Sequence, residues 1–110
     1  ELEKLLLCGP HKRIRAEVHN ALGYLWLRKR EMAIARDHLS QAIELEPELS
    51  VAYFNMAELA RMEKNLRLAE TQLKNAIDLD PQYADAWLEL GFVHLENKKI
   101  DDAESCFDNV

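Results

Sequence analysis

The chain has 110 residues, enough for one small domain and too few for a two-domain enzyme. Hydrophobic residues make up 48% and charged residues 31%, which is typical of a folded protein rather than a disordered one. A formal net charge of −6 argues against the broad basic surface that binds a phosphate backbone, so we expect no nucleic-acid partner. Three glycines and three prolines are too few for a turn-rich β sandwich, and the composition favours helices.

The apolar and cysteine residues exclude several further classes. No apolar run exceeds the four residues of Leu5 to Cys8, which is too short for a transmembrane span or the core of a signal peptide, so no membrane partner is expected. Cys8 and Cys106 lie 98 positions apart without a CxxC pair or clustered histidines. We therefore predict free thiols, no disulfide, no metal, no cofactor and a cytoplasmic location.

An internal repeat of 34 residues organises the chain. The segment Ile43 to Pro47, Ile-Glu-Leu-Glu-Pro, recurs as Ile-Asp-Leu-Asp-Pro at Ile77 to Pro81. Apolar and small residues elsewhere keep the same offset, for example Ala35, Ala69 and Ala103. The period divides the chain into residues 16–49, 50–83 and a truncated 84–110, preceded by residues 1–15.

Residues 1–15 come first and have two interpretations. A shift by 34 places Leu5 and Cys8 on Leu39 and Ala42, which indicates the second helix of a preceding repeat, ended by Gly9 and Pro10. The alternative is a separate capping helix. Because the chain begins at Glu1 without a methionine and stops inside a unit, we expect it to be cut from a longer array.

Each of the three units that follow reads as two amphipathic helices. Apolar residues recur at helical spacing on both sides of short polar breaks at 29–31, 63–65 and 97–99, which suit tight helix hairpins. Pro47 and Pro81 lack an amide hydrogen and should end the second helices of the first two units. Gly23, Ala57 and Gly91 fall in step and predict close packing between the two helices of a unit.

These features together resemble the tetratricopeptide repeat. The third unit carries the pattern best, with Trp87, Leu90, Gly91, Ala103 and Phe107 in their usual order. The resemblance implies an all-α, right-handed superhelical solenoid of antiparallel helix pairs whose first helices line a concave groove. The turn glycine of the family is replaced by Arg30, Lys64 and Lys98, so we expect Asn65 and Asn97 to supply the tight turn in the last two units.

The concave groove should hold a peptide or a helix of a partner protein. Its expected lining is the part of each first helix that faces away from the core: Glu17, Asn20, Tyr24, Leu27, Val51, Phe54, Asn55, Glu58, Arg61, Met62, Asp85, Leu88, Glu89, Phe92 and Leu95. This predicts an apolar floor with acidic edges, which fits an apolar partner carrying basic residues. The aromatic residues of this set either form a binding strip or pack against neighbouring helices.

Individual groove residues refine this expectation through the resemblance. Asn55 stands where peptide-binding members hold the ligand backbone with an asparagine, although it is also compatible with a solvated surface. Members that bind heat-shock proteins clamp a carboxylate with basic residues, and those positions are Asn20, Asp85 and Glu89 here. These residues would repel or ignore a carboxylate, so the sequence disfavours that subclass.

No catalytic constellation or nucleotide motif occurs, so the sequence does not predict an enzyme. His19 and His94 occupy positions of core aromatics and are expected to be packed and hydrogen-bonded. The favoured function is a protein-interaction scaffold. The alternatives are a substrate-recognition segment of a larger enzyme, such as a glycosyltransferase, and a self-assembly module in which terminal helices stack between chains.

Overall fold

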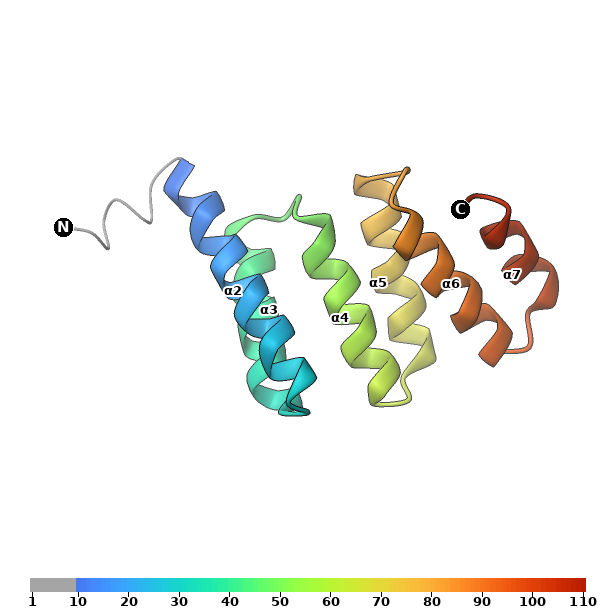
Figure 1. The fold of residues 1–110 in the computed structure, drawn as a ribbon, viewed down its shortest axis with the longest axis horizontal. Helices are drawn as coiled ribbons and strands as arrows, with labels where there is room; N and C mark the ends of the chain where they lie inside the picture. Colours follow the sequence, from blue (N-terminus) through green and yellow to red (C-terminus); the bar gives the residue numbers. More distant parts are fainter. Residues whose placement is uncertain (1–9) are drawn as a thin grey trace.

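The structure, a computed structural model, describes residues 10–110, and this part of the chain is entirely helical apart from short turns (Figure 1). The helices are α2 (Pro10–Arg28), α3 (Met32–Leu45), α4 (Ser50–Met62), α5 (Leu66–Leu79), α6 (Ala84–Glu96) and α7 (Ile100–Phe107). The two interpretations of residues 1–15 concern mainly residues 1–9, which lie outside the described part. Residues 10–15 belong to α2, whose first residue is a proline, as the first turn of a helix permits.

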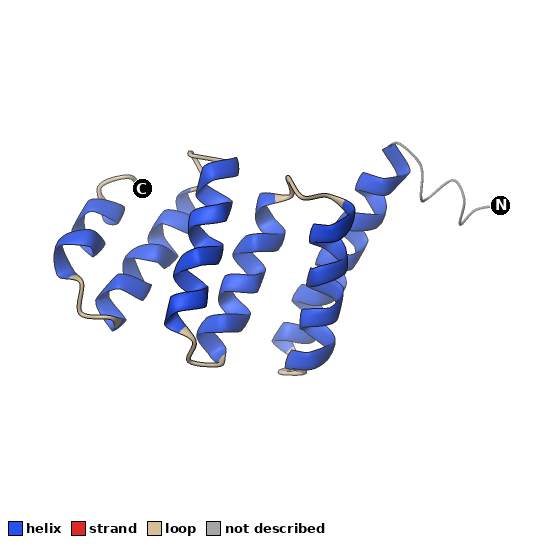
Figure 2. Ribbon diagram, turned by 180° about the vertical axis from the view of Figure 1, so that it is seen from behind, coloured by secondary structure: helices blue, strands red, loops and turns tan. Residues whose placement is uncertain are grey.

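Consecutive helices form antiparallel pairs, α2 with α3, α4 with α5 and α6 with α7, and each pair packs against the next. The result is a ribbon of 53 × 28 × 17 Å. Figure 1 looks onto α2, α4 and α6, which we call the first-helix face, and Figure 2 shows α3, α5 and α7 from behind. The predicted all-α solenoid of helix pairs is thereby confirmed, with breaks at the predicted polar turns.

The turns within the three pairs share one backbone geometry. Arg30, Lys64 and Lys98 have φ values of 65°, 65° and 62°, in the left-handed region that favours glycine. At the first turn, the Glu31 amide donates to Trp26 O (3.0 Å) and the Arg30 amide to Leu27 O (3.0 Å). This Schellman pattern repeats at the other two turns and satisfies the last carbonyls of each first helix.

The prediction that asparagines supply the left-handed turn is therefore wrong. Asn65 and Asn97 have φ values of −96° and −91°. Asn65 instead caps the next helix, because its side-chain oxygen accepts a hydrogen bond from the Leu68 amide at 3.2 Å. Lysine or arginine takes the strained position, where its charge interacts favourably with the negative end of the preceding helix.

The turns between pairs are fixed by the two prolines. Helices α3 and α5 end just before Pro47 and Pro81, as predicted. The Tyr53 hydroxyl donates to Pro47 O at 3.1 Å, and Trp87 Nε1 donates to Pro81 O at 2.8 Å. The two hydrogen bonds are 34 residues apart in sequence. Each one joins the start of a first helix, α4 or α6, to the end of the helix pair before it.

The core lies between the two layers of helices and depends on small residues opposite large ones. Ala35, Ala69 and Ala103 are at most 1% exposed. A Cβ placed on Gly23 would lie 2.6 Å from Leu39 Cγ, and one on Gly91 would overlap the Phe107 ring. The prediction of close packing at these glycines is confirmed, and the opposing side chains are those of Leu39 and Phe107.

Candidate functional site: the first-helix face

A pocket of about 380 Å³ lies on the first-helix face and joins all three of its helices. We call it the first-helix pocket, and its lining is Leu27, Arg28, Arg30, Glu58, Arg61, Met62 and Glu89. Five of these residues, all except Arg28 and Arg30, belong to the groove predicted from the sequence. The structure thus brings residues from three repeat units into one concavity.

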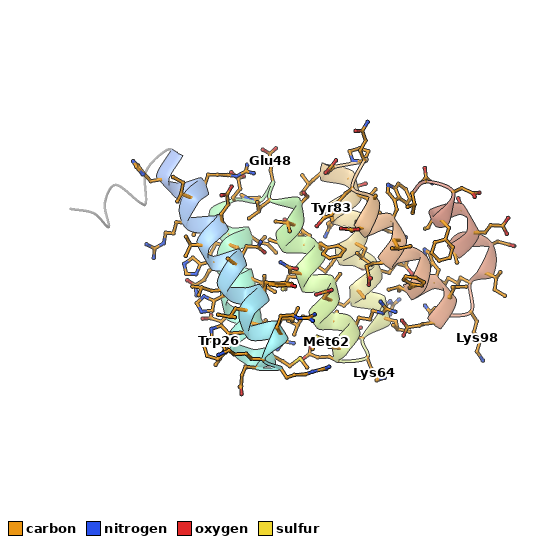
Figure 3. The ribbon with its side chains drawn as sticks, viewed as in Figure 1. Trp26, Glu48, Met62, Lys64, Tyr83 and Lys98 are labelled. Carbon is orange, nitrogen blue, oxygen red and sulfur yellow. The ribbon has the colours of Figure 1, made fainter. Side chains whose placement is uncertain are left out.

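The remaining predicted groove residues spread along the same face. Glu17, Tyr24, Asp85, Phe92 and Leu95 are exposed, whereas Asn20, Val51, Phe54 and Leu88 are half-buried. Figure 3 shows the lower rim of the face, where Met62 and Lys64 lie, and the opposite rim, where Glu48 lies.

Leu27 and Asn55 depart from the prediction that they project into the groove. Leu27 is 1% exposed and belongs to a core cluster with Ala35 and Leu59, so only its edge lines the pocket. Asn55 is 4% exposed, and its Nδ2 donates to Asn20 Oδ1 at 2.9 Å. Both side chains are buried because α2 and α4 pack directly against each other at this level.

The aromatic residues divide between structural contacts and exposed surface. Phe54 packs against the core and stacks on Tyr83 with a centroid distance of 5.3 Å. Tyr83 lies between α4 and α6 (Figure 3). Phe92 meets Phe107 edge-on at 5.5 Å, yet 38% of it remains exposed. Tyr24, 48% exposed, is the aromatic most available to a ligand.

Arg61 neutralises much of the acidity that the sequence predicts for the groove. Its Nη1 lies 2.6 Å from Glu89 Oε2, and its Nη2 lies 2.6 Å from Glu96 Oε1. This bridges α4 and α6 across two repeat units. Glu17 is likewise paired, with Arg13 Nε at 3.2 Å.

Two predicted groove carboxylates, Glu58 and Asp85, have no ion-pair partner among residues 10–110. Burial, and then the charge of Glu89, raises the pKa of Glu58. Burial, together with Asp85, Asp80 and Glu58, raises the pKa of Tyr83 to about 12. This part of the face therefore has a negative potential that a ligand cation would relieve.

Two contributors were missed in the sequence. Tyr83 ends the linker before α6 and was not assigned to the groove, although an aromatic residue two positions after Pro81 is a usable signal. Arg30 reaches the pocket because of its left-handed backbone. Its position is that of the missing turn glycine, but no sequence rule says which way such a side chain points.

A second pocket, of about 430 Å³, lies between α5, α6 and α7 and includes His94 and Cys106. His94 is 5% exposed, as predicted, but its Nδ1 makes no hydrogen bond and lies 3.7 Å from Glu70 Oε1. Burial, and then the charge of Asp102, raises the pKa of the free Cys106 thiol, which disfavours the thiolate form.

The other predicted histidine, His19, is packed and hydrogen-bonded as expected. Its Nδ1 lies 3.1 Å from His38 Nδ1, and the rings stack at 5.3 Å. In the described part of the chain, no three His, Cys, Asp or Glu side chains are grouped as a metal site. None of the described helices has the length and apolar character needed to cross a bilayer.

Comparisons with known proteins agree with this architecture. Residues 60–110 match the family model described as tetratricopeptide repeat. No curated protein matches the chain by sequence.

Solved structures share the fold. The chain is similar to MamA (TM-score 0.82, 21% identity, covering 98% of this chain and 61% of MamA). It is similar to the second TPR of Spaghetti (RPAP3) bound to the HSP90 peptide SRMEEVD (TM-score 0.83, 18% identity, covering 88% and 90%). It also matches PilF of Pseudomonas aeruginosa (TM-score 0.84, 20% identity, covering 89% and 44%). The chain thus spans less than two thirds of MamA and of PilF. Residues 60–110 thus match the tetratricopeptide repeat family, and the chain shares the fold of a solved tetratricopeptide repeat.

Proposed function

We propose that this chain is a protein-interaction scaffold whose first-helix face holds a segment of a partner protein. The observation that carries the proposal is the first-helix pocket, in which residues of three repeat units form one concavity beside exposed Tyr24 and Phe92. Aromatic side chains on a concave surface are typical of sites that anchor a peptide. The RPAP3 repeat with the same fold was solved with a peptide bound, which supports this role.

The chemistry of the proposed partner follows from the two unpaired carboxylates. Glu58 and Asp85 favour a lysine or arginine of the bound segment, while the exposed rings of Tyr24 and Phe92 favour apolar side chains. A carboxylate at the centre of this face would meet Glu58 and Glu89 instead. The proposed ligand is therefore an apolar segment with a basic residue.

Selection of random twelve-residue peptides displayed on phage tests this proposal. We expect the selected peptides to combine apolar residues with lysine or arginine, and to lose affinity about fivefold or more with Tyr24→Ala or Glu58→Gln. The matched control is Glu104→Gln, because Glu104 is an exposed residue of α7, and this variant should leave the affinity unchanged. Failure to select any peptide that depends on Tyr24 or Glu58 would refute the proposed groove.

A further inference from the structure

Four cations lie at the turns within the first and second helix pairs, on one edge of the ribbon (Figure 3). Arg28, Lys29, Arg30 and Lys64 are exposed, and within residues 10–110 none of them forms an ion pair. We call these four residues the basic edge. In a chain with 20 acidic and 14 basic residues, such a group gives this edge a local positive potential, which Glu58 and Glu89 of the adjoining pocket offset in part.

The acidic residues of the same turns do little to offset this charge. Glu63 is bound by Arg36 of α3. The other carboxylate of the turns at 29–31 and 63–65 is Glu31, which is exposed and forms no ion pair with the described residues. The basic edge therefore keeps an excess of positive charge.

The backbone holds two of these cations at an energetic cost. Arg30 and Lys64 have left-handed backbones, a conformation that is unfavourable for a residue with a Cβ but not for glycine. The other two are ordered by aromatic rings. The Arg28 guanidinium lies 5.9 Å from the Tyr24 centroid, and Lys29 Nζ lies 5.3 Å from that of Trp26.

The first-helix pocket opens beside this edge, which gives an incoming chain a place to anchor. Arg28 and Arg30 line it together with the apolar side chains Leu27 and Met62. Figure 3 shows Met62 and Lys64 at the same rim of the ribbon. A volume of about 380 Å³ accommodates one or two side chains of a bound segment.

We propose that the basic edge docks an acidic segment of a partner protein, which places one apolar side chain in the first-helix pocket and its carboxylates against Arg28, Arg30 and Lys64. A short acidic segment suits this edge better than a nucleic acid or an anionic membrane. A phosphate backbone or a membrane surface would extend past these four cations and over the acidic remainder of the chain, whereas a short segment does not. This proposal shares the first-helix pocket with the proposed groove, but its carboxylates go to the basic edge and not to Glu58, so the two proposals are tested with different peptides.

Titration of the isotope-labelled chain with synthetic heptapeptides tests the proposal by NMR. The probe has a central leucine flanked by three glutamates on each side, and its controls carry glutamine or lysine in place of glutamate. We expect the glutamate peptide to shift the amide signals of Arg28, Arg30, Met62 and Lys64, with an affinity that falls as salt is raised. The control peptides should bind much more weakly.

The double variant Arg30→Gly with Lys64→Gly separates lost binding from lost folding. Glycine relieves the left-handed strain, so this variant should unfold at a higher temperature while its affinity for the glutamate peptide falls about fivefold or more. Lys98→Gly changes the same backbone position of the third turn, away from the pocket, and should keep the affinity within about twofold.

Three results would overturn the proposal. The first is equal affinity for the glutamate and lysine peptides. The second is a loss of affinity with Lys98→Gly as large as with the double variant. The third is no binding of the glutamate peptide. Concentration-dependent self-association of the wild-type chain that the double variant abolishes would assign the edge to a second copy instead. If the glutamate peptide binds while Tyr24→Ala leaves phage-selected peptides unaffected, only the groove proposal fails.

Discussion

The first helix pair and the two that follow share one period, but the starts of their first helices are fixed differently. Before α4 and α6, a proline turn accepts a hydrogen bond from Tyr53 or Trp87. At the corresponding place in the first unit, α2 runs on without a break from Pro10, and His19, in the position of Tyr53, bonds to His38 instead. The aromatic-to-proline bond thus requires a preceding pair that ends in proline.

Burial shows the same contrast between the units. Val18 and Leu25 of α2 are 52% and 47% exposed. Ala52 and Leu59, their counterparts 34 residues later, are 0% and 2% exposed because α3 covers them. A repeat position is therefore buried by the helix that precedes it in space, and identical patterns in sequence do not guarantee identical environments.

The largest expected effect tests the pairing of small and large residues within a unit. Leu39→Ala should lower the free energy of unfolding by about 2–5 kcal/mol, because it leaves a cavity beside Gly23. Adding Gly23→Ala should recover part of this loss by refilling the space and favouring the helix. Urea unfolding of the single and double variants measures both effects.

The corresponding pair in the second unit is the control. There Ala57 already has a Cβ, so Leu73→Ala should be costly without an equivalent rescue. A further loss of stability from Gly23→Ala in the Leu39→Ala background would contradict the pairing.

A medium effect tests the bond that distinguishes the later units. Tyr53→Phe removes the hydroxyl that donates to Pro47 and should destabilise the chain by about 0.5–1.5 kcal/mol. Tyr24→Phe is the control, since the Tyr24 hydroxyl makes no hydrogen bond with the described residues. His19→Tyr should not create a stabilising bond, because α2 has no proline turn beside it. Thermal unfolding that showed a gain from His19→Tyr would break the comparison.

A smaller effect tests a feature that all three units share. Lys64→Gly should stabilise the chain by about 0.5–1 kcal/mol, because glycine adopts the left-handed backbone without strain. Lys64→Ala, which keeps a Cβ, should give no such gain. Chemical denaturation of both variants measures the difference, and equal stability of the two would show that the turn is not strained.

The smallest effect is a pH dependence confined to the first unit. Burial, followed by the charges of His38 and Arg15, lowers the pKa of His19 below the 6.5 of a free histidine. The unfolded chain then binds the proton more readily, so this group contributes stability at higher pH that is lost as the pH falls through about 6.5. Unfolding measured between pH 8 and 5 should show a shallower decline for His19→Gln than for the wild type. An identical decline would exclude a role for His19.

The local pattern of the sequence determined most of the fold. Apolar residues at helical spacing, polar breaks and the two prolines predicted the helix pairs and their boundaries, because helix amphipathicity and proline geometry act over a few residues. The first-helix face followed in outline, since most of the predicted groove residues do lie on it. These features depend only on neighbours within one unit or on the strict repetition of units.

The details of the site needed the tertiary structure. The burial of Leu27 and Asn55, and the neutralisation of Glu89 by Arg61, arise from contacts between helices of different units. Position along the chain also decided which residue is left-handed in each turn. The hydrogen bonds that close each first helix require this conformation two residues after the helix ends, and a lysine or arginine adopts it there. The spacing of apolar, polar and proline residues thus specifies the helix pairs and their order. Packing between the pairs then decides which charged and aromatic side chains stay exposed to a partner.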